Sequence, residues 1–142
     1  IELPVDAKSA LESGALGVGL FRSEFLFMNR GGELPGEDEQ FEAYRAAVEA
    51  MNGLPVTIRT VDIGADKPLE RMSVNELRHE HALNPALGLR AIRWSLSEPG
   101  MFRQQLRAIL RASAYGKVRM QRHWFCRSSF AISISYRSAR TI

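Results

Sequence analysis

Residues 17–24 read Gly-Val-Gly-Leu-Phe-Arg-Ser-Glu, and residues 55–62 read Pro-Val-Thr-Ile-Arg-Thr-Val-Asp. In each stretch, a short apolar run ends in an arginine, then a small hydroxyl residue, with an acid close behind. Short apolar runs of this kind, entered through Gly or Pro, are typical of buried strands. We therefore predict strands at 18–21 and 55–58, and these two strands decide the fold.

Segments with helical periodicity lie between these two strands and after the second strand. Residues 37–51 predict an amphipathic helix, because apolar side chains recur at three- and four-residue spacing. Acids fill its first turn, where the helix dipole favours them, and Asn52-Gly53 ends it. The apolar face consists of Phe41, Tyr44, Ala47, Val48 and Met51.

A second helix is predicted from Ser97, as N-cap, to Ala114. Its apolar face is expected to carry Met101, Leu106, Ile109 and Leu110. The remaining expected elements are a strand end at 1–3, a short helix over 6–13, a strand from Val118 and an unframed edge strand at 131–136.

The order strand, helix, strand, helix, strand indicates an α/β protein with a parallel sheet. Periodicity by itself does not distinguish a closed barrel from an open, doubly wound sheet.

Composition indicates a globular protein, with 45% hydrophobic and 25% charged residues. No apolar run approaches the roughly 18 residues that would suggest a membrane span. The start at Ile1 is expected to be an interior cut of a longer protein. A lone cysteine, Cys126, cannot form an internal disulfide, which favours a cytoplasmic location.

The net charge of +3 comes from the C-terminal residues. From residue 119 onward the chain carries five arginines and no acid, whereas residues 1–118 carry 14 basic and 16 acidic side chains. The tail lacks the aromatic interleaving of a nucleic-acid platform, so we expect no nucleic-acid partner.

Arg22 and Arg59 are the leading candidates for a binding site. Parallel α/β folds place ligand-binding residues at the carboxyl ends of strands. Two guanidinium forks there would suit a phosphate or a carboxylate. The alternative is that each arginine pairs with a nearby acid and orders its own loop.

Weaker candidates follow along the chain. The turn at 63–68 could add contacts to a phosphate, and the segment 84–93 brings Arg90 and Arg93 three residues apart. For each of these, a solvated loop or an ion pair is an alternative. The histidines at 79, 81 and 123 form no convincing metal set, and Cys126 has no recognisable partner.

Five collinear blocks resemble the enzyme I family of sugar phosphotransferase systems, the phosphoenolpyruvate-protein phosphotransferases. They are GVGLFRSEFLFM (17–28), EDEQFEAY (37–44), TIRTVDIGADK (57–67), NPALGLRAIR (84–93) and QLRAILRASA (105–114). Phosphoenolpyruvate synthase and pyruvate phosphate dikinase share this barrel but are less similar around residues 25–28 and at the start of the 37–51 helix.

The resemblance implies a (β/α)8 barrel that binds phosphoenolpyruvate and Mg²⁺, of which this chain would hold roughly the first half. It implies phosphate transfer to a histidine of the same protein and then to a histidine-containing phosphocarrier protein, by a cytoplasmic homodimer. By position in the motifs, Arg22 and Arg59 match phosphoenolpyruvate-binding arginines, and Arg90 matches a further active-site arginine.

The resemblance covers residues 1–119, which we expect to form a partial phosphoenolpyruvate-binding domain. Residues 120–142 depart from the family and are interpreted as an aberrant basic tail, such as a frameshift would produce. The family's phosphohistidine, Mg²⁺ ligands and catalytic cysteine belong to segments outside these blocks. The chain alone is therefore expected to be poorly stable and inactive; a non-catalytic anion-binding lobe is the alternative.

Overall fold

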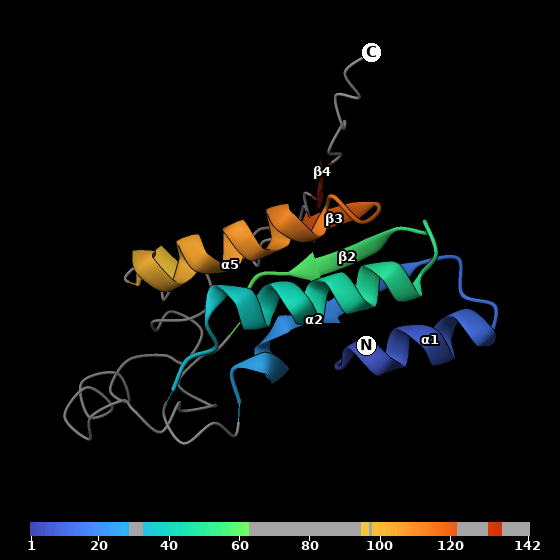
Figure 1. The fold of residues 1–142 in the computed structure, drawn as a ribbon, viewed down its shortest axis with the longest axis horizontal. Coiled ribbons are helices and arrows are strands. Elements are labelled where there is room, and N and C mark those ends of the chain that lie inside the picture. Colours follow the sequence, from blue (N-terminus) through green and yellow to red (C-terminus); the bar gives the residue numbers. More distant parts are fainter. Residues whose placement is uncertain (29–32, 63–94, 97, 122–130, 135–142) are drawn as a thin grey trace, which may run out of the picture.

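The structure of the chain is a computed structural model that describes residues 1–28, 33–62, 95–96, 98–121 and 131–134. Figure 1 shows its elements in chain order. They are α1 (Pro4–Glu12), β1 (Val18–Arg22), the 3₁₀ helix η1 (Ser23–Leu26), α2 (Glu37–Ala50), β2 (Val56–Arg59), α5 (Pro99–Ala112), β3 (Val118–Gln121) and β4 (Ala131–Ile134).

The strands form one four-stranded sheet in the order β1-β2-β3-β4. β1 pairs with β2 and β2 with β3 in parallel, whereas β4 runs antiparallel to β3. The predicted α/β class and parallel pairing are confirmed for the first three strands. The edge strand expected at 131–136 is present over Ala131–Ile134, and its antiparallel direction was not predicted.

The described helices cover one face of the sheet (Figure 1). α2 connects β1 to β2 and packs between α1 and α5, while α5 precedes β3 and packs on it. The predicted apolar face of α2 is confirmed, since all five of its residues are buried. These side chains meet the strands in the main core, where the Phe21 ring stands edge-on to the Tyr44 ring with centroids 5.7 Å apart.

Three local predictions are corrected. Residues 1–3 form no strand, although the Ile1 amino group donates to the Leu20 carbonyl beside β1. The N-cap of α5 is Glu98 rather than Ser97. Leu110 is 52% exposed, because the buried face of α5 is rotated toward Gln105 and Ala112.

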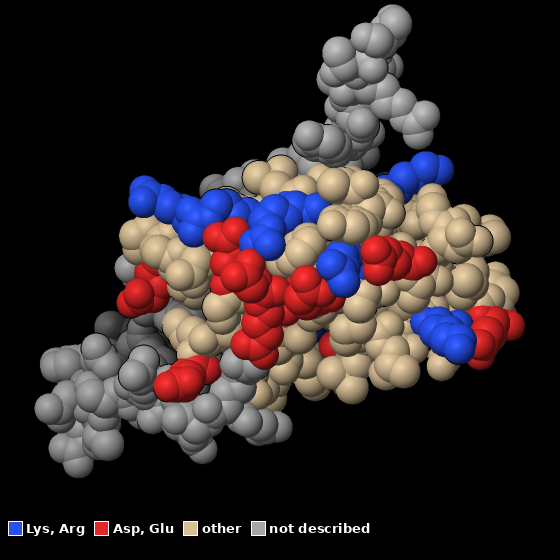
Figure 2. Space-filling view, in the orientation of Figure 1, with Lys and Arg blue, Asp and Glu red and all other residues tan. Residues whose placement is uncertain are grey.

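Charged side chains join α2 to α5 on the outer surface of the helix layer. Figure 2 shows the basic side chains beside the acidic ones on this face. The Arg107 Nε donates to Glu37 Oε2 at 2.5 Å, and Arg111 donates to Glu37 Oε1 at 2.9 Å and to Asp38 Oδ1 at 2.7 Å. Hydrogen bonds from Arg107 and Arg111 hold the pKa of Glu37 below its ordinary value.

None of the helices in the described ranges is both long and apolar enough to cross a membrane.

The entry to β1 depends on Gly17. Its φ is +157°, and a Cβ built there would lie 2.8 Å from the carbonyl oxygen of Pro55, which accepts the Val18 N–H at 2.8 Å. A side chain at this position would push β1 away from the start of β2. The close pairing of these two strands therefore requires glycine.

We predict that Gly17→Ala lowers the free energy of unfolding by about 1–3 kcal/mol, because the backbone is strained and the Pro55 carbonyl must move. The measurement is urea denaturation of the purified chain. Gly19→Ala, two residues further along in β1, is the matched control, because a Cβ there meets nothing within 4 Å. A Gly17→Ala chain as stable as the Gly19→Ala chain would contradict the prediction.

Glu37 should also give the stability of the chain a pH dependence. Its pKa is lower in the folded chain than the ordinary value of 4.5, so its contribution is complete above about pH 4.5 and is lost as the pH falls through the folded-state pKa. In Glu37→Gln, the unfolding free energy should therefore fall less steeply below pH 4.5. Urea titrations at several pH values measure this. Equal pH slopes for the parent and Glu37→Gln would show that the pairing of Glu37 with Arg107 and Arg111 does not stabilise the fold.

Candidate strand-end site

The carboxyl ends of the parallel strands bring three polar side chains into one row. Arg22 is the register partner of Arg59, and Arg59 is the partner of Gln121. The preceding row consists of Phe21, Ile58 and Met120, of which Phe21 and Ile58 are buried in the core beneath the helices. Because successive residues of a strand point to opposite faces, the polar row points away from the face on which α2 and α5 pack.

The structure therefore brings Arg22 and Arg59 together as predicted. Gln121 is a third member of the row that sequence reasoning missed. A lone glutamine after a short apolar strand carries no recognisable signal, and only the β2–β3 register places it here.

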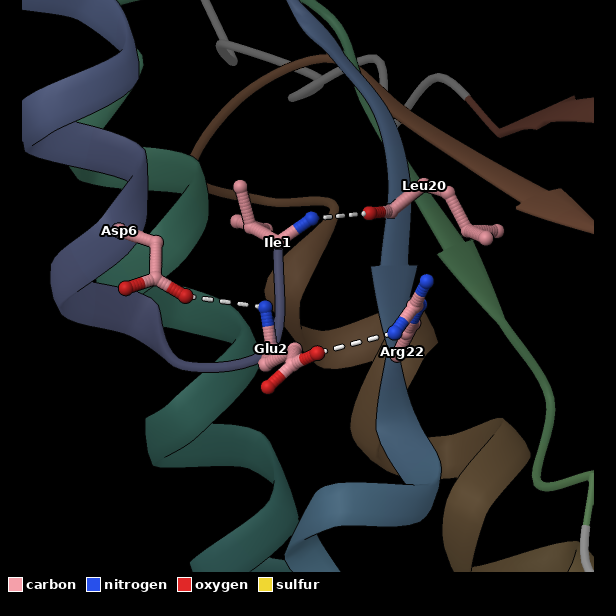
Figure 3. A pocket seen from close by; sticks show the side chains of 5 residues that line it. All are labelled: Ile1, Glu2, Asp6, Leu20 and Arg22. Carbon is pink, nitrogen blue, oxygen red and sulfur yellow. Dashed lines mark hydrogen bonds and ion pairs between the residues drawn. The ribbon is translucent and has the colours of Figure 1, made fainter.

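Arg22 lies in an open setting at the edge of β1. Its guanidinium donates to Glu2 Oε1 at 2.9 Å, and both side chains are about half exposed. Arg22 lines a hollow of about 490 Å³ together with Ile1, Glu2, Asp6 and Leu20. Figure 3 shows these five side chains.

The carboxylate of Asp6 organises the far side of this hollow. Its Oδ2 accepts the backbone N–H groups of Leu3 at 2.9 Å and Glu2 at 3.0 Å, as the first turn of α1 begins. These bonds lower the pKa of Asp6. They also fix the segment that carries Glu2 toward Arg22.

Arg59 lies in a much more enclosed setting. Its guanidinium is ion-paired with Glu24 from η1, and it lies 3.6 Å from a carboxylate oxygen of Asp62. The Glu24 side chain is only 4% exposed. Among the described residues, Glu24 Oε2 and Arg59 Nε are buried without a hydrogen-bond partner.

Both arginines thus pair with acids, as the alternative interpretation expected, but only one pairing is local in sequence. Asp62 follows Arg59 by three residues, whereas Glu24 reaches Arg59 across the sheet and Glu2 reaches Arg22 from before α1. A guanidinium carries five N–H donors, so each arginine keeps donors beyond those used on its acid. These remaining donors are the groups that the row offers to an anion.

A divalent cation does not fit the described part of this site. Glu24 and Asp62 are the carboxylates beside Arg59, and both face its positive charge. No group of three or more His, Cys, Asp or Glu side chains that could hold a metal occurs in the described ranges. The described residues therefore offer cationic donors rather than a Mg²⁺ ligand set.

A buried hydrogen-bond network lies directly behind the row. Gln105, on α5, is fully buried, and its Oε1 accepts the N–H of Val61 at 3.0 Å. Its Nε2 donates to Ser23 Oγ and to the Tyr44 hydroxyl, each at 3.1 Å. Ser23 Oγ in turn donates to the carbonyl of Arg59 at 2.6 Å.

The network continues into α2. The hydroxyl of Tyr44 donates to Gln40 Oε1 at 3.3 Å, and Gln40 Nε2 donates to the Pro35 carbonyl at 2.9 Å. Burial raises the pKa of Tyr44 far above its ordinary value, so the hydroxyl keeps its proton and remains a donor. Sequence reasoning missed Gln105 and Gln40, because a glutamine inside a helical pattern normally indicates an exposed position.

Several predicted residues lie outside the described part of the chain. They are Arg90, Arg93, His79, His81, His123, Cys126, the turn at 63–68 and most of the arginine-bearing tail. The interpretation of residues 120–142 as a separate tail stays a prediction, although the β3 strand runs to Gln121.

The fold and the row together define a class: α/β proteins that carry cationic side chains at the carboxyl ends of parallel strands. The chain belongs to the family of PEP-utilising enzymes (PEP, phosphoenolpyruvate), whose PEP-binding domain matches residues 1–121.

Relatives of known name agree with this assignment. The chain is 73% identical over 120 residues to a phosphoenolpyruvate-protein phosphotransferase of Cupriavidus necator, and 52% identical over 120 residues to that of Geobacillus stearothermophilus. With the protein of Staphylococcus carnosus the identity is 51% over 118 residues. These matches cover 83–84% of this chain, whereas the chain spans about a fifth (20%) of the length of each relative.

The two arginines should differ sharply in their effect on stability. We predict that Arg59→Ala lowers the free energy of unfolding by about 3 kcal/mol, because it leaves the buried Glu24 carboxylate without its counter-charge. Arg22→Ala should cost less than about 1 kcal/mol, because its pair with Glu2 is half exposed. Urea denaturation of the two variants measures the difference.

Glu24→Gln supplies the control for this comparison. Placed in the Arg59→Ala background, it removes the uncompensated charge and should recover part of the lost stability. An equal loss of unfolding free energy in Arg22→Ala and Arg59→Ala would contradict the prediction. So would a double variant, Glu24→Gln with Arg59→Ala, that is no more stable than Arg59→Ala alone.

Proposed function

We propose that this chain is part of a phosphoenolpyruvate-protein phosphotransferase and that Arg22 and Arg59 bind phosphoenolpyruvate. The observation that carries the proposal is the register pairing of these two arginines at adjacent strand ends. The names of the relatives favour this reading over phosphoenolpyruvate synthase or pyruvate phosphate dikinase, which were the alternatives within the family.

The chemistry of the ligand matches the chemistry of the row. Phosphoenolpyruvate carries a phosphate and a carboxylate on neighbouring carbons, so two cationic forks side by side can hold both groups. During phosphoryl transfer the negative charge moves onto the transferring oxygens, and fixed guanidinium groups stabilise it there. Arg22 is the more exposed of the two and can exchange Glu2 for an incoming anion.

The single-faced helix layer supports a barrel rather than a doubly wound sheet. The strands β1, β2 and β3 follow one another in space as in sequence, and the described helices lie on one face (Figure 1). A (β/α)8 barrel repeats this arrangement until the sheet closes, with its active site at the carboxyl ends of the strands. We propose that residues 1–119 form roughly the first half of such a barrel, to which Arg90 contributes a further arginine.

The transfer of phosphate, the partner protein and the oligomeric state concern the whole protein, of which this chain would be a part. We propose that it passes phosphate from phosphoenolpyruvate to a histidine of its own and then to a histidine-containing phosphocarrier protein, as a cytoplasmic homodimer. Mg²⁺ would neutralise phosphate charge, but the described residues do not supply its ligands. The 142 residues alone are proposed to be inactive.

The second candidate is a non-catalytic lobe that binds anions without discriminating between them. The same two arginines support it, because their guanidinium groups recognise phosphate and carboxylate in any ligand. The two proposals differ in specificity: phosphoenolpyruvate presents both groups, whereas inorganic phosphate presents one.

We predict that the chain binds phosphoenolpyruvate weakly, with a Kd on the order of 1 mM, and without dependence on Mg²⁺. Calorimetric titration with and without MgCl₂ measures this. Arg22→Ala/Arg59→Lys should abolish the binding, since it removes one fork and replaces the other with a point charge while keeping a cation beside Glu24. Arg103→Ala, at an exposed arginine of α5, is the matched control and should bind as the parent does.

The competing outcomes are distinct. Equal affinity for inorganic phosphate and phosphoenolpyruvate would favour the anion-binding lobe. Persistent binding in the double variant would place the site elsewhere. Tight, Mg²⁺-dependent binding, or phosphoryl transfer by the chain alone, would overturn the proposal that these residues are an inactive part of the whole protein.

A further inference from the structure

Two apolar clusters lie along the inner face of α5, and Gln105 lies between them. The main core includes Ala108, Ile109 and Ala112. One helical turn before Gln105, Met101 belongs to a smaller cluster that also contains Phe27 and Val61. Gln105 is thus a fully buried amide at the boundary between the helix–sheet core and the cluster beneath the strand ends.

The hydrogen bonds of Gln105 reach both strand-end segments that carry the arginines. Its Oε1 accepts the N–H of Val61, two residues after Arg59. Its Nε2 donates to Ser23 Oγ, one residue after Arg22, and that hydroxyl donates to the backbone carbonyl of Arg59. The segments that follow β1 and β2 are therefore both hydrogen-bonded to the side chain of Gln105, which belongs to α5.

The Val61 N–H fixes the orientation of the Gln105 amide. The N–H of Val61 can only donate, so the amide oxygen of Gln105 faces it and the NH₂ group faces Ser23 and Tyr44. Both N–H groups of Nε2 are then used, and no polar atom of Gln105 is left without a partner. A fully buried and fully satisfied network favours one geometry, because a displacement that breaks one of its bonds leaves a buried polar group unpaired.

We infer that Gln105 is a positioning residue that sets the separation of Arg22 and Arg59 at the strand ends. This inference rests on the proposed function for the identity of the ligand. Gln105 acts through Ser23 and Val61, whose backbones flank the two arginines. Its replacement should therefore misplace the guanidinium pair while leaving both arginines present.

The test compares phosphoenolpyruvate affinity with stability in matched variants. Gln105→Leu keeps the approximate volume but removes all three hydrogen bonds, and we expect the affinity to fall about tenfold. Ser23→Ala removes only the hydroxyl between Gln105 and the Arg59 carbonyl, and it should weaken binding in the same direction. Ser23→Ala carries the test on its own should Gln105→Leu fail to fold.

Ile109→Val is the control for general destabilisation, since it trims the same face of α5 in the main core. Its Tm should fall, while its affinity for phosphoenolpyruvate stays within about twofold of the parent. If Ile109→Val loses as much affinity as Gln105→Leu at equal Tm, or if Gln105→Leu binds like the parent, Gln105 has a structural role only and the inference is overturned.

A readout without ligand separates this inference from the proposed function. In Gln105→Leu, amide hydrogen exchange should accelerate at Val61 and Thr60 and stay slow in the buried part of α2. Uniform acceleration would overturn the positioning role. A parent chain that binds no phosphoenolpyruvate, yet shows this local acceleration in the variant, would refute the proposed ligand and leave the positioning of the two strand ends supported.

Discussion

Parallel strands can be joined only by a crossover that returns the chain to the same end of the sheet. In this chain α2 makes that return between β1 and β2, and everything at the strand ends depends on the resulting register. Val18 pairs with Val56, and a register shift between Val18 and Phe21 then places Phe21 opposite Ile58 and Arg22 opposite Arg59, so the two strands end level with each other. The close approach at Gly17 holds this register at the other end of β1.

The level strand ends place two identical side chains in unequal surroundings. Arg22 is on β1, the edge strand of the described sheet, where solvent screens its half-exposed pair with Glu2. Arg59 is on the next strand inward, where Glu24 and the segment after β2 enclose it. Arg22 can therefore change partners at little cost in free energy, whereas the pair of Arg59 with buried Glu24 is needed for the stability of the fold.

Polar contacts in this fold divide between the two surfaces of the helix layer. On the outer surface, Arg107 and Arg111 bind Glu37 where water screens them, and these pairs orient α5 against α2. On the inner surface Gln105 is fully buried, and each of its polar atoms has a hydrogen-bond partner. The cost of breaking the inner contacts is correspondingly larger. The hydrogen bonds that cost most to break are thus next to the strand ends.

The sequence by itself determined the α/β class, the strand–helix–strand order, the buried face of α2 and the position of each arginine at the end of a strand. These features are local, since hydrophobic periodicity and strand-end motifs span fewer than about 15 residues. Only the tertiary structure decided which acid pairs with which arginine, that Gln121 joins their row, and that Gln105 is buried while Leu110 is exposed. Those contacts join residues far apart in the chain, 35 residues for Glu24 and Arg59 and 82 for Ser23 and Gln105, so no local pattern carries them.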